Sequence, residues 1–411
     1  MITSKGILLK EGQKSLSAAS TRDKNKALEL VHAAVEKNKK KILRANQEDL
    51  EEGRKNQMSA ALLDRLALDD ERMGWILDGI KTVAKLDDPV WQSSSVTTLE
   101  NGLTITKMAV PLGVIGIIYE SRPNVTVDAF SLALKSGNGI LLRGSSSALR
   151  SNKALVEAIK EGLAASPISP EVIQFIDDPD RSHVEDMLRA NDILDLIIPR
   201  GGAGLINFVI ANSSVPTLQT GEGNCHTFVD ASADLDKALK ILVNAKAQRL
   251  GVCNTCETLL VHKDVARDFL PRVEEVFRNR IELRACDKSR EFGNFLPASE
   301  EDYATEFLDA ILAIKVVDSL DEAIDHVNKY GTMHSEAIVT ESLTSANRFQ
   351  REVDAAVVYV NASTRFTDGA EFGYGAEMGI STQKIHARGP VGLQQLTTYK
   401  YLVMGQGQIR E

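Results

Sequence analysis

The chain has 411 residues, 43% of them hydrophobic, which is enough for two or more domains with sizeable cores. Its formal net charge of −9 argues against non-specific nucleic-acid binding, and no stretch approaches the roughly 20 apolar residues of a membrane span. Four cysteines are too few for a disulfide framework, and no second Cys pair completes a zinc site with Cys253-Asn-Thr-Cys256. We therefore expect a cytoplasmic protein without a metal site.

The N-terminal part predicts helices. Residues 15–56 are rich in Ala, Leu, Lys and Glu, lack proline, and carry apolar residues at helical spacing between Leu28 and Val35. Residues 62–85 continue in the same style after a polar break. No chemistry is expected from this region.

A β-hairpin is predicted next. Residues 97–109 show the alternating pattern of two β-strands on either side of Asn101-Gly102. This dipeptide best suits a type I′ turn. A hairpin at this place would serve as a flap or an oligomer arm. The β-like run 396–403 near the C-terminus is a candidate to pair with it.

The segment from Pro111 to Tyr119 is a continuous apolar run, typical of a buried parallel strand. It ends in the polar cluster Glu120-Ser-Arg-Pro-Asn124. Open α/β sheets bind their ligands at the carboxyl ends of such strands. We therefore expect this cluster to belong to a binding site.

The same order of elements then repeats. A helix over 127–135 is followed by a short strand over 140–143, the polar stretch Gly144-Ser-Ser-Ser147 and a helix over 148–164. Serines and backbone amides at a helix N-terminus suit a phosphate, and Arg143 would add a charge. An ordinary serine N-cap explains the pattern equally well.

Strands over 172–176 and 194–199 continue this alternation, and Arg200-Gly-Gly-Ala-Gly204 follows as a weak glycine signal. The alternation predicts a nucleotide-binding α/β domain with right-handed crossovers. A second α/β unit is expected after the helix over 235–246.

Cys253 lies at the centre of the stretch 248–262, in a predicted loop before a β-run over 258–261. Loops held by rigid strands often carry chemistry, whereas an unpaired cysteine is also among the most buried residue types. The local pattern alone leaves both roles open. Cys256 faces the next strand and is predicted to be a packing residue.

The rest of the second unit is predicted to contain an acidic, loop-like stretch over 287–306, a strand over 313–317 and a helix over 319–328. The segment 357–388 is dense in glycine, threonine and charge.

Several separated motifs together resemble the γ-glutamyl phosphate reductase family, also called glutamate-5-semialdehyde dehydrogenases, within the aldehyde dehydrogenase superfamily. They lie in family order and extend over nearly the whole chain. The matching stretches are Tyr119–Thr126, Ile198–Gly202, Gly223–His226, Gly251–Asn254, Tyr330–Glu336, and Val360–Gly369 through His386–Pro390.

The resemblance implies an α/β fold with a Rossmann-type NADPH-binding domain, a catalytic α/β domain and a small β oligomerisation arm. The expected cofactor domain comprises 1–95 and 113–229, and the catalytic domain comprises 230–372. The arm comprises 96–112 and 390–411, and 373–389 would be a substrate or linker segment that returns to the cofactor domain.

The implied reaction is the NADPH-dependent reduction of L-glutamate 5-phosphate to L-glutamate 5-semialdehyde and phosphate, the second step of proline biosynthesis from glutamate. Cys253 would attack the acyl carbon and form a thioester. Asn124 matches the oxyanion asparagine of the superfamily, although an Asx-turn after proline would also explain an asparagine there. Gln219 aligns where hydrolytic relatives carry a glutamate base, which fits a reductase.

The resemblance also assigns binding residues. Arg143 replaces the usual cofactor lysine of the superfamily. The expected cofactor-binding residues are Arg143, Gly144, Ser145, Ser146, Gly201, Gly202 and Glu306. The expected substrate-binding residues are Ser121, Arg122, Arg365, His386 and Arg388, and Lys384 is a further cation. For the C-terminal four, Arg365, Lys384, His386 and Arg388, a structural role explains the residue as well as contact with substrate.

Partners and alternatives follow from the same resemblance. A homodimer or a dimer of dimers is expected, and glutamate 5-kinase is a possible supplier of the labile substrate. Two alternatives stay open: a non-catalytic oligomeric scaffold with the aldehyde dehydrogenase fold, and an acylating aldehyde dehydrogenase that uses coenzyme A. Intact Cys253 and Asn124 disfavour the scaffold.

Overall fold

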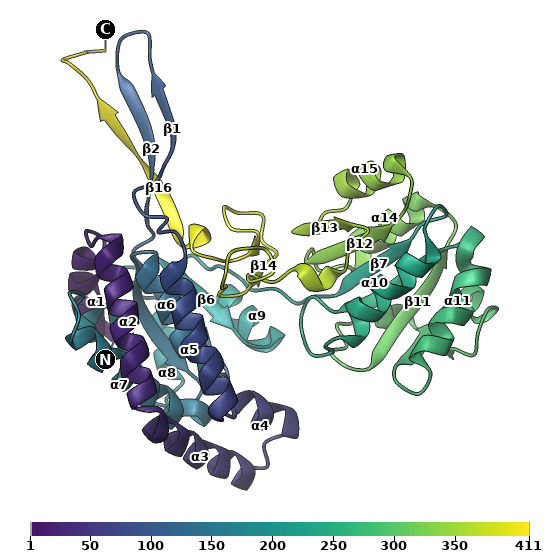
Figure 1. Cartoon of the computed structure of the whole chain (residues 1–411), viewed down its shortest axis with the longest axis horizontal. Coiled ribbons are helices and arrows are strands. Elements are labelled where there is room, and N and C mark those ends of the chain that lie inside the picture. The colour runs from purple at the N-terminus through teal and green to yellow at the C-terminus, as the bar shows by residue number, and fades with distance from the viewer. Residues whose placement is uncertain (1, 411) are drawn as a thin grey trace. The chain divides into compact units, whose positions relative to one another are not determined.

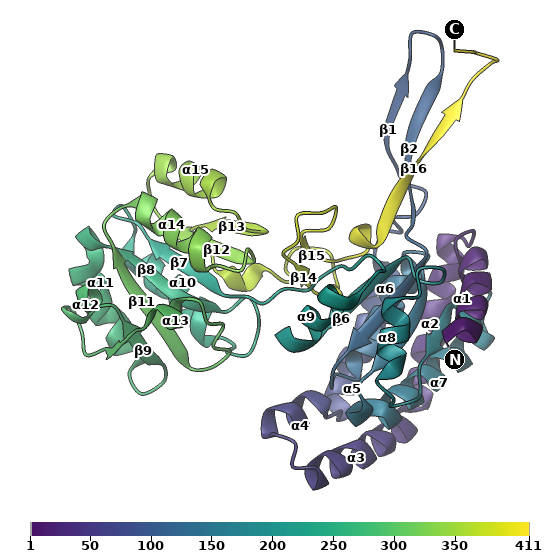
Figure 2. The same ribbon diagram turned by 180° about the vertical axis from the view of Figure 1, so that it is seen from behind.

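The computed structural model describes residues 2–410, shown from two sides in Figures 1 and 2. The chain divides into two compact units, each built from separate stretches of sequence. The first unit contains the chain up to Thr220, residues 373–379 and the chain from Val391 onward. The second unit contains residues 221–372 and 380–390.

The first unit combines helices with two sheets. Its α-helices are α1 (Ile2–Leu16), α2 (Thr21–Lys37), α3 (Lys39–Lys55), α4 (Ala60–Leu66), α5 (Asp70–Lys85), α6 (Asn124–Lys135), α7 (Leu149–Ala164), α8 (Ser182–Leu188) and α9 (Ala203–Asn212). Its strands are β1 (Ser93–Thr98), β2 (Thr104–Pro111), β3 (Val114–Tyr119), β4 (Gly139–Gly144), β5 (Ile173–Phe175), β6 (Leu196–Arg200) and β16 (Thr397–Met404). Short 3-10 helices cover Ser146–Ala148, Pro170–Val172 and Gln394–Leu396.

The central sheet of this unit has the strand order β5-β4-β3-β6 and is parallel throughout. Strands β3 and β4 are buried along their whole length because helices cover both faces of the sheet. One apolar cluster joins Leu9 of α1, Met187 of α8 and Val209 of α9 to Ile118 of β3. Helices α6 and α7 also contact the strands, and α2 packs against both of these helices. The predicted α/β architecture is confirmed.

The N-terminal helices match the predicted pattern with one addition. Helix α2 begins after Ser20, whose side chain accepts a hydrogen bond from the Asp23 N–H, and it buries the predicted stripe around Leu28. Helix α1 was not predicted. Its two glycines weaken a helical pattern, yet they permit close packing, because a Cβ at Gly12 would lie 2.9 Å from the Glu171 carbonyl carbon.

The predicted arm is a three-stranded antiparallel sheet of order β1-β2-β16 (Figure 1). Strand β16 pairs with β2 along its whole length, so the predicted pairing of the C-terminal run with the hairpin is confirmed. The predicted type I′ turn is wrong. Leu99 and Leu103 close a three-residue loop in which Gly102 has a φ of +85°. A glycine in the left-handed region at the end of such a loop is a common alternative to the two-residue turn.

The second unit is built around a larger sheet. Its α-helices are α10 (Leu235–Ala247), α11 (Lys263–Phe277), α12 (Asp287–Arg290), α13 (Glu300–Tyr303), α14 (Leu320–Tyr330) and α15 (Leu343–Glu352). Its strands are β7 (Cys225–Val229), β8 (Cys256–His262), β9 (Glu282–Ala285), β10 (Leu296–Pro297), β11 (Ile311–Val317), β12 (Ser335–Val339), β13 (Val357–Val360), β14 (Ile380–Ser381) and β15 (Gly389–Pro390). A 3-10 helix covers Thr364–Phe366.

The parallel sheet of the second unit has the order β10-β9-β11-β8-β7-β12-β13. Residues along β8 alternate between two apolar clusters, because successive side chains of a strand point to opposite faces. Leu259 and Val261 pack with α10 and α11, whereas Leu260 packs with α14 and α15. The sheet is therefore covered by helices on both faces.

The units differ from the predicted division in two places. Strand β7 pairs with β8 and β12, so the boundary falls after Thr220 rather than after residue 229. The segment 373–389 is divided between the units. The stretch 287–306, predicted as a loop, contains α12, β10 and α13, each too short to give a periodic pattern.

Within residues 2–410, every helix is too short or too polar to cross a membrane.

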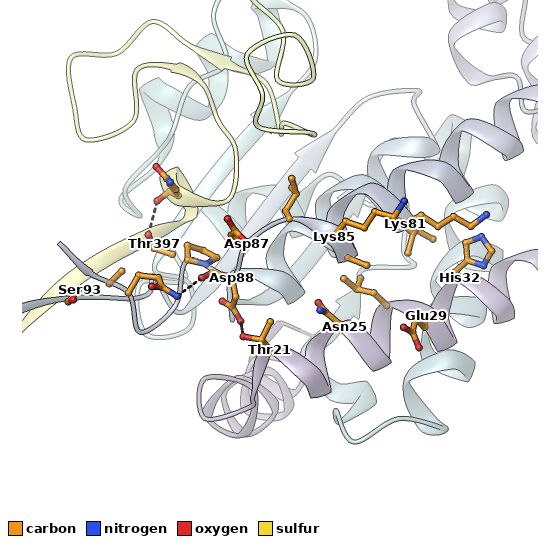
Figure 3. A pocket seen from close by; sticks show the side chains of 18 of the residues that line it. Thr21, Asn25, Glu29, His32, Lys81, Lys85, Asp87, Asp88, Ser93 and Thr397 are labelled. Atoms are coloured by element: carbon orange, nitrogen blue, oxygen red, sulfur yellow. Dashed lines mark hydrogen bonds between the residues drawn. The ribbon is translucent and has the colours of Figure 1, made fainter.

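A buried ion pair lies beside a cavity of the first unit. Lys24 of α2 is fully buried, and its Nζ lies 2.9 Å from Asp88 Oδ2 and 3.3 Å from the Lys135 carbonyl oxygen. Asp88 also accepts a hydrogen bond from the Thr21 hydroxyl. The cavity is about 1300 Å³ and is lined by α2, α5 and residues near β1 and β16 (Figure 3). Among the described residues, those that line it include none of the predicted site residues.

This ion pair gives the first prediction. The variant Asp88→Ala leaves the Lys24 ammonium buried without its counter-ion, which typically costs about 3–5 kcal/mol of unfolding free energy. Urea denaturation of the variant measures this loss. The matched control is Glu29→Ala, which breaks the exposed Lys26–Glu29 pair on the same helix and should change stability far less. Equal stability of the two variants would contradict a supporting role for the buried pair.

Candidate functional site

Cys253 lies in the loop between α10 and β8, as predicted, and its side chain is partly exposed. The turn that carries it is closed on both sides. The Thr255 N–H donates to the Val252 carbonyl (3.1 Å), and the Thr255 hydroxyl donates to the Arg249 carbonyl (2.8 Å). A thiol in this position is both accessible and fixed by its neighbours.

The next residue, Asn254, fastens this loop to the 3-10 helix Thr364–Phe366. Its Nδ2 donates to the Thr367 carbonyl (2.9 Å) and to the Arg365 carbonyl (3.3 Å). The Thr364 hydroxyl donates in return to the Asn254 carbonyl (2.7 Å). These three bonds restrict the backbone on the C-terminal side of the thiol.

The Cys253 backbone also approaches the start of β7 closely. A Cβ placed on Gly223 would lie 1.4 Å from the Cys253 carbonyl oxygen, so only glycine fits there. The Cys225 thiol donates to the same carbonyl oxygen (3.2 Å). The loop is thus held from β7 as well as from residues 364–367.

The other thiols are in different surroundings. Cys225 and Cys256 are fully buried. Burial raises the pKa of the Cys225 thiol, and it raises the pKa of Cys256 to about 12. The prediction that Cys256 is a packing residue is confirmed. Cys286 is partly exposed, and its Sγ lies 3.1 Å from Ser289 Oγ.

Two histidines from the matching motifs are buried and structural. The Glu336 carboxylate accepts a hydrogen bond from the His226 N–H (2.7 Å) and lies 3.0 Å from His226 Nδ1. Burial raises the pKa of Glu336. Burial lowers the pKa of His334 to about 4, so its imidazole is neutral at pH 7.

Glu306, a predicted cofactor residue, lies in the second unit beside Gly223. Its Oε1 accepts a hydrogen bond from the Gly223 N–H (2.8 Å), and burial raises its pKa. The carboxylate therefore borders the same glycine that supports the Cys253 loop.

The C-terminal cations divide into two groups. Arg365 is half-buried next to the Cys253 loop, and its Nε donates to Gln248 Oε1 (2.9 Å). Arg388 donates to Asp354 Oδ1 (2.8 Å), and Lys384 forms an ion pair with the same carboxylate. His386 is exposed. Of these, Arg365 is the one that the described contacts bring to the Cys253 loop.

In the first unit, the predicted polar stretches lie at one edge of the parallel sheet. Strands β4, β3 and β6 are direct neighbours, so their carboxyl ends meet there. Ser121, Arg122 and Asn124 follow β3. Arg143 to Ser146 end β4 and continue from it, and Gly201 with Gly202 follows β6.

The β4 end of this edge offers hydroxyl groups. Ser145 is half-exposed and Ser146 is exposed. Ser147 Oγ lies 2.9 Å from Ser121 Oγ and 2.5 Å from Ser145 Oγ. Gly144 fits only because it lacks a side chain, since a Cβ there would lie 2.2 Å from Asn152 Nδ2.

Arg143 is buried, and its guanidinium donates to the carbonyl groups of Gly144, Pro179 (3.0 Å) and Asp180 (3.3 Å). Burial and the neighbouring Arg181 lower its pKa. Its Nε is buried without a hydrogen-bond partner among the described residues.

The β6 end is a glycine turn at the N-terminus of α9. Gly201 and Gly202 are exposed. The Gly202 N–H donates to Glu120 Oε2 (2.9 Å), and a Cβ on Gly201 would lie 2.6 Å from that oxygen. The turn is therefore compact and closed by a carboxylate.

Asn124 is the first residue of α6, and its Nδ2 donates to Asp128 Oδ2 one turn further along the helix (2.9 Å). The Val125 and Thr126 N–H groups donate to backbone carbonyls, so the side chain is not used to form an Asx-turn. Burial raises the pKa of Asp128 to about 6.

The sequence matches the aldehyde dehydrogenase family over residues 9–302 and 296–401. The chain therefore belongs to the aldehyde dehydrogenase family. An acetylating aldehyde dehydrogenase from Geobacillus thermoglucosidasius shares the fold, with a TM-score of 0.72 at 15% identity over 100% of this chain and 97% of that one.

Within that family, the chain belongs with the γ-glutamyl phosphate reductases. It is 57% identical to a γ-glutamyl phosphate reductase of Alkaliphilus metalliredigens (strain QYMF) over 98% of both chains. The crystal structure of the γ-glutamyl phosphate reductase of Thermotoga maritima has a TM-score of 0.98 at 52% identity and covers 100% of both chains. The resemblance found in the motifs is confirmed.

The close approach of Gly223 to Cys253 gives the second prediction. In Gly223→Ala the added methyl group displaces the Cys253 carbonyl, and a shift of about 1 Å in a reacting group typically costs about 10²-fold in rate. The measurement is kcat for aldehyde oxidation. The control is Gly251→Ala, where a Cβ meets nothing within 4 Å, and near-normal kcat is expected. A similar kcat in both variants would show that the contact does not position the thiol.

Proposed function

We propose that this chain is an NADPH-dependent oxidoreductase of class 1.2.1 that reduces L-glutamate 5-phosphate to L-glutamate 5-semialdehyde and phosphate, the second step of proline biosynthesis. Membership of the γ-glutamyl phosphate reductases supports this activity. The structural observation that supports it most is the partly exposed Cys253, held on both sides of its loop.

The proposed chemistry begins at Cys253. Its thiolate attacks the acyl carbon of the acyl phosphate, the carbon–oxygen bond to phosphate breaks, and a thioester forms with release of phosphate. The nicotinamide cofactor, when bound, supplies the hydride that reduces the acyl group. The resulting thiohemiacetal oxyanion collapses, its carbon–sulfur bond breaks, and the aldehyde and the Cys253 thiolate are released.

Both steps place negative charge on the acyl oxygen. We assign the Asn124 side-chain amide and the Cys253 N–H as the donors that stabilise it, since loss of one such donor typically costs about 10²–10³-fold in rate. The second N–H of the Asn124 amide serves this role, because the first donates to Asp128. Gln219 stands in place of a general base, which protects the thioester from water.

A nicotinamide cofactor is expected throughout the aldehyde dehydrogenase family. NADPH is our finer assignment. The serine hydroxyls at the end of β4 fit a phosphate of the dinucleotide, and the charge of the neighbouring Arg143 guanidinium fits an added phosphate. The proposed cofactor residues remain Arg143, Gly144, Ser145, Ser146, Gly201, Gly202 and Glu306.

The substrate carries a phosphate and an α-carboxylate, so local cations are required in an acidic protein. We assign Ser121 and Arg122 to the phosphate and Arg365 to the carboxylate. His386 and Arg388 are weaker candidates, because Arg388 is already paired with Asp354. A cytoplasmic homo-oligomer that receives its substrate from glutamate 5-kinase completes the proposal.

The alternatives are less well supported. A non-catalytic scaffold has no need of an accessible thiol beside an orienting network. The coenzyme A alternative rests on relatives at about the 15% identity of the Geobacillus enzyme, which shows a shared fold alone.

The third prediction tests the proposed nucleophile in the reverse direction, because the forward substrate is labile. The wild type should reduce NADP⁺ with L-glutamate 5-semialdehyde only when phosphate is present, and Cys253→Ala should abolish NADPH formation. The control is Cys286→Ala, which removes the other partly exposed thiol and should keep full activity. Normal turnover in Cys253→Ala would rule out the thioester route.

A further inference from the structure

Asp128 is a carboxylate that the proposed reaction leaves without a role. It follows Asn124 by one helical turn, and the two side chains share a hydrogen bond of 2.9 Å. Only its Oδ2 is used in this bond. Among the described residues, the cation that acts on this carboxylate is Arg200, and it acts through charge at longer range than a hydrogen bond. Asp128 is therefore a half-buried anion whose hydrogen-bond partner is neutral.

Its electrostatic surroundings favour a cation. Burial raises the pKa of Asp128 to about 6, whereas the Asn124 hydrogen bond and the more distant Arg200 act in the opposite direction. A cation at hydrogen-bond distance would stabilise the ionised form directly.

The second carboxylate oxygen lies beside a glycine of helix α5. A Cβ placed on Gly79 would lie 3.6 Å from Asp128 Oδ1 and would meet no side chain of another element nearer than that. Because position 79 has no side chain, none from this position of α5 covers this oxygen.

We propose that Asp128 is a specificity residue that binds the α-ammonium group of the amino-acid substrate through Oδ1, beside Gly79. This inference rests on the proposed function and identifies a group that selects its substrate. The α-ammonium is the one cation on L-glutamate 5-phosphate, and five bonds separate its nitrogen from the acyl oxygen, at most about 6 Å. Asn124 Nδ2 and Asp128 Oδ2 are 2.9 Å apart, and Oδ1 belongs to the same carboxylate, so one substrate molecule can span both side chains.

The experiment compares two aldehydes in the reverse reaction: L-glutamate 5-semialdehyde and 5-oxopentanoate, which lacks the amino group. The variant Asp128→Asn keeps an acceptor for the Asn124 amide but removes the charge. For the amino aldehyde, kcat/KM should fall about 10–100-fold, the usual effect of losing a charge-assisted hydrogen bond. For 5-oxopentanoate it should change by less than about twofold.

The second variant, Gly79→Ala, introduces no clash. Its methyl group lies at van der Waals distance from Asp128 Oδ1, and alanine suits a helix better than glycine. It should raise KM for the amino aldehyde and leave KM for 5-oxopentanoate unchanged. The charge control is Asp78→Asn on the exposed side of α5, which should alter neither substrate.

The outcomes are distinct. Equal losses for both aldehydes in Asp128→Asn would reduce Asp128 to a positioning residue for Asn124 and overturn the proposal. Unchanged kinetics for the amino aldehyde in Asp128→Asn would overturn it as well. A wild type inactive on L-glutamate 5-semialdehyde would overturn the proposed function itself, and this is measured before any variant.

Discussion

The position of the Cys253 thiol depends on one close backbone contact. The Gly223 Cα lies against the Cys253 carbonyl, so the loop before β8 is placed by the strand next to it in the sheet. Cys225 and Asn254 then hold the same loop by hydrogen bonds that start from different elements. A partly exposed thiol is thereby attached to the two central strands of the second unit.

The contacts around this loop also separate the residues that support it from those that can react. Cys225 is a donor to the loop, and its buried thiol has a raised pKa that disfavours the nucleophilic thiolate. His226 Nδ1 and Glu336 Oε2 form a hydrogen bond inside the sheet, while His226 Nε2 and Glu336 Oε1 are buried without a partner in the described part of the chain. Cys225, His226 and Glu336 are residue types that often act in catalysis. Because all three are buried, we assign them a structural role.

Much of the fold could be predicted from local sequence patterns, and the failures have physical causes. The apolar runs of β3 and β4 and the stripe of α2 are local signals, and each was confirmed. Helix α1 was missed because its glycines serve packing against distant residues. The site showed the same limit: Cys253 was found in its loop, whereas the partner of Asn254 is 113 residues away in sequence.

In the proposed function, cations around the Cys253 loop offset the acidic net charge of the protein where the anionic substrate binds. Lys384 and Arg388 are neutralised by Asp354, so their charge is locally balanced. Arg365 differs, because burial and the neighbouring Arg249 lower its pKa. An anion between two such guanidinium groups would relieve their repulsion and replace lost hydration. On this proposal, the net charge of the chain matters less for substrate binding than the local charge of Arg365 and Arg249.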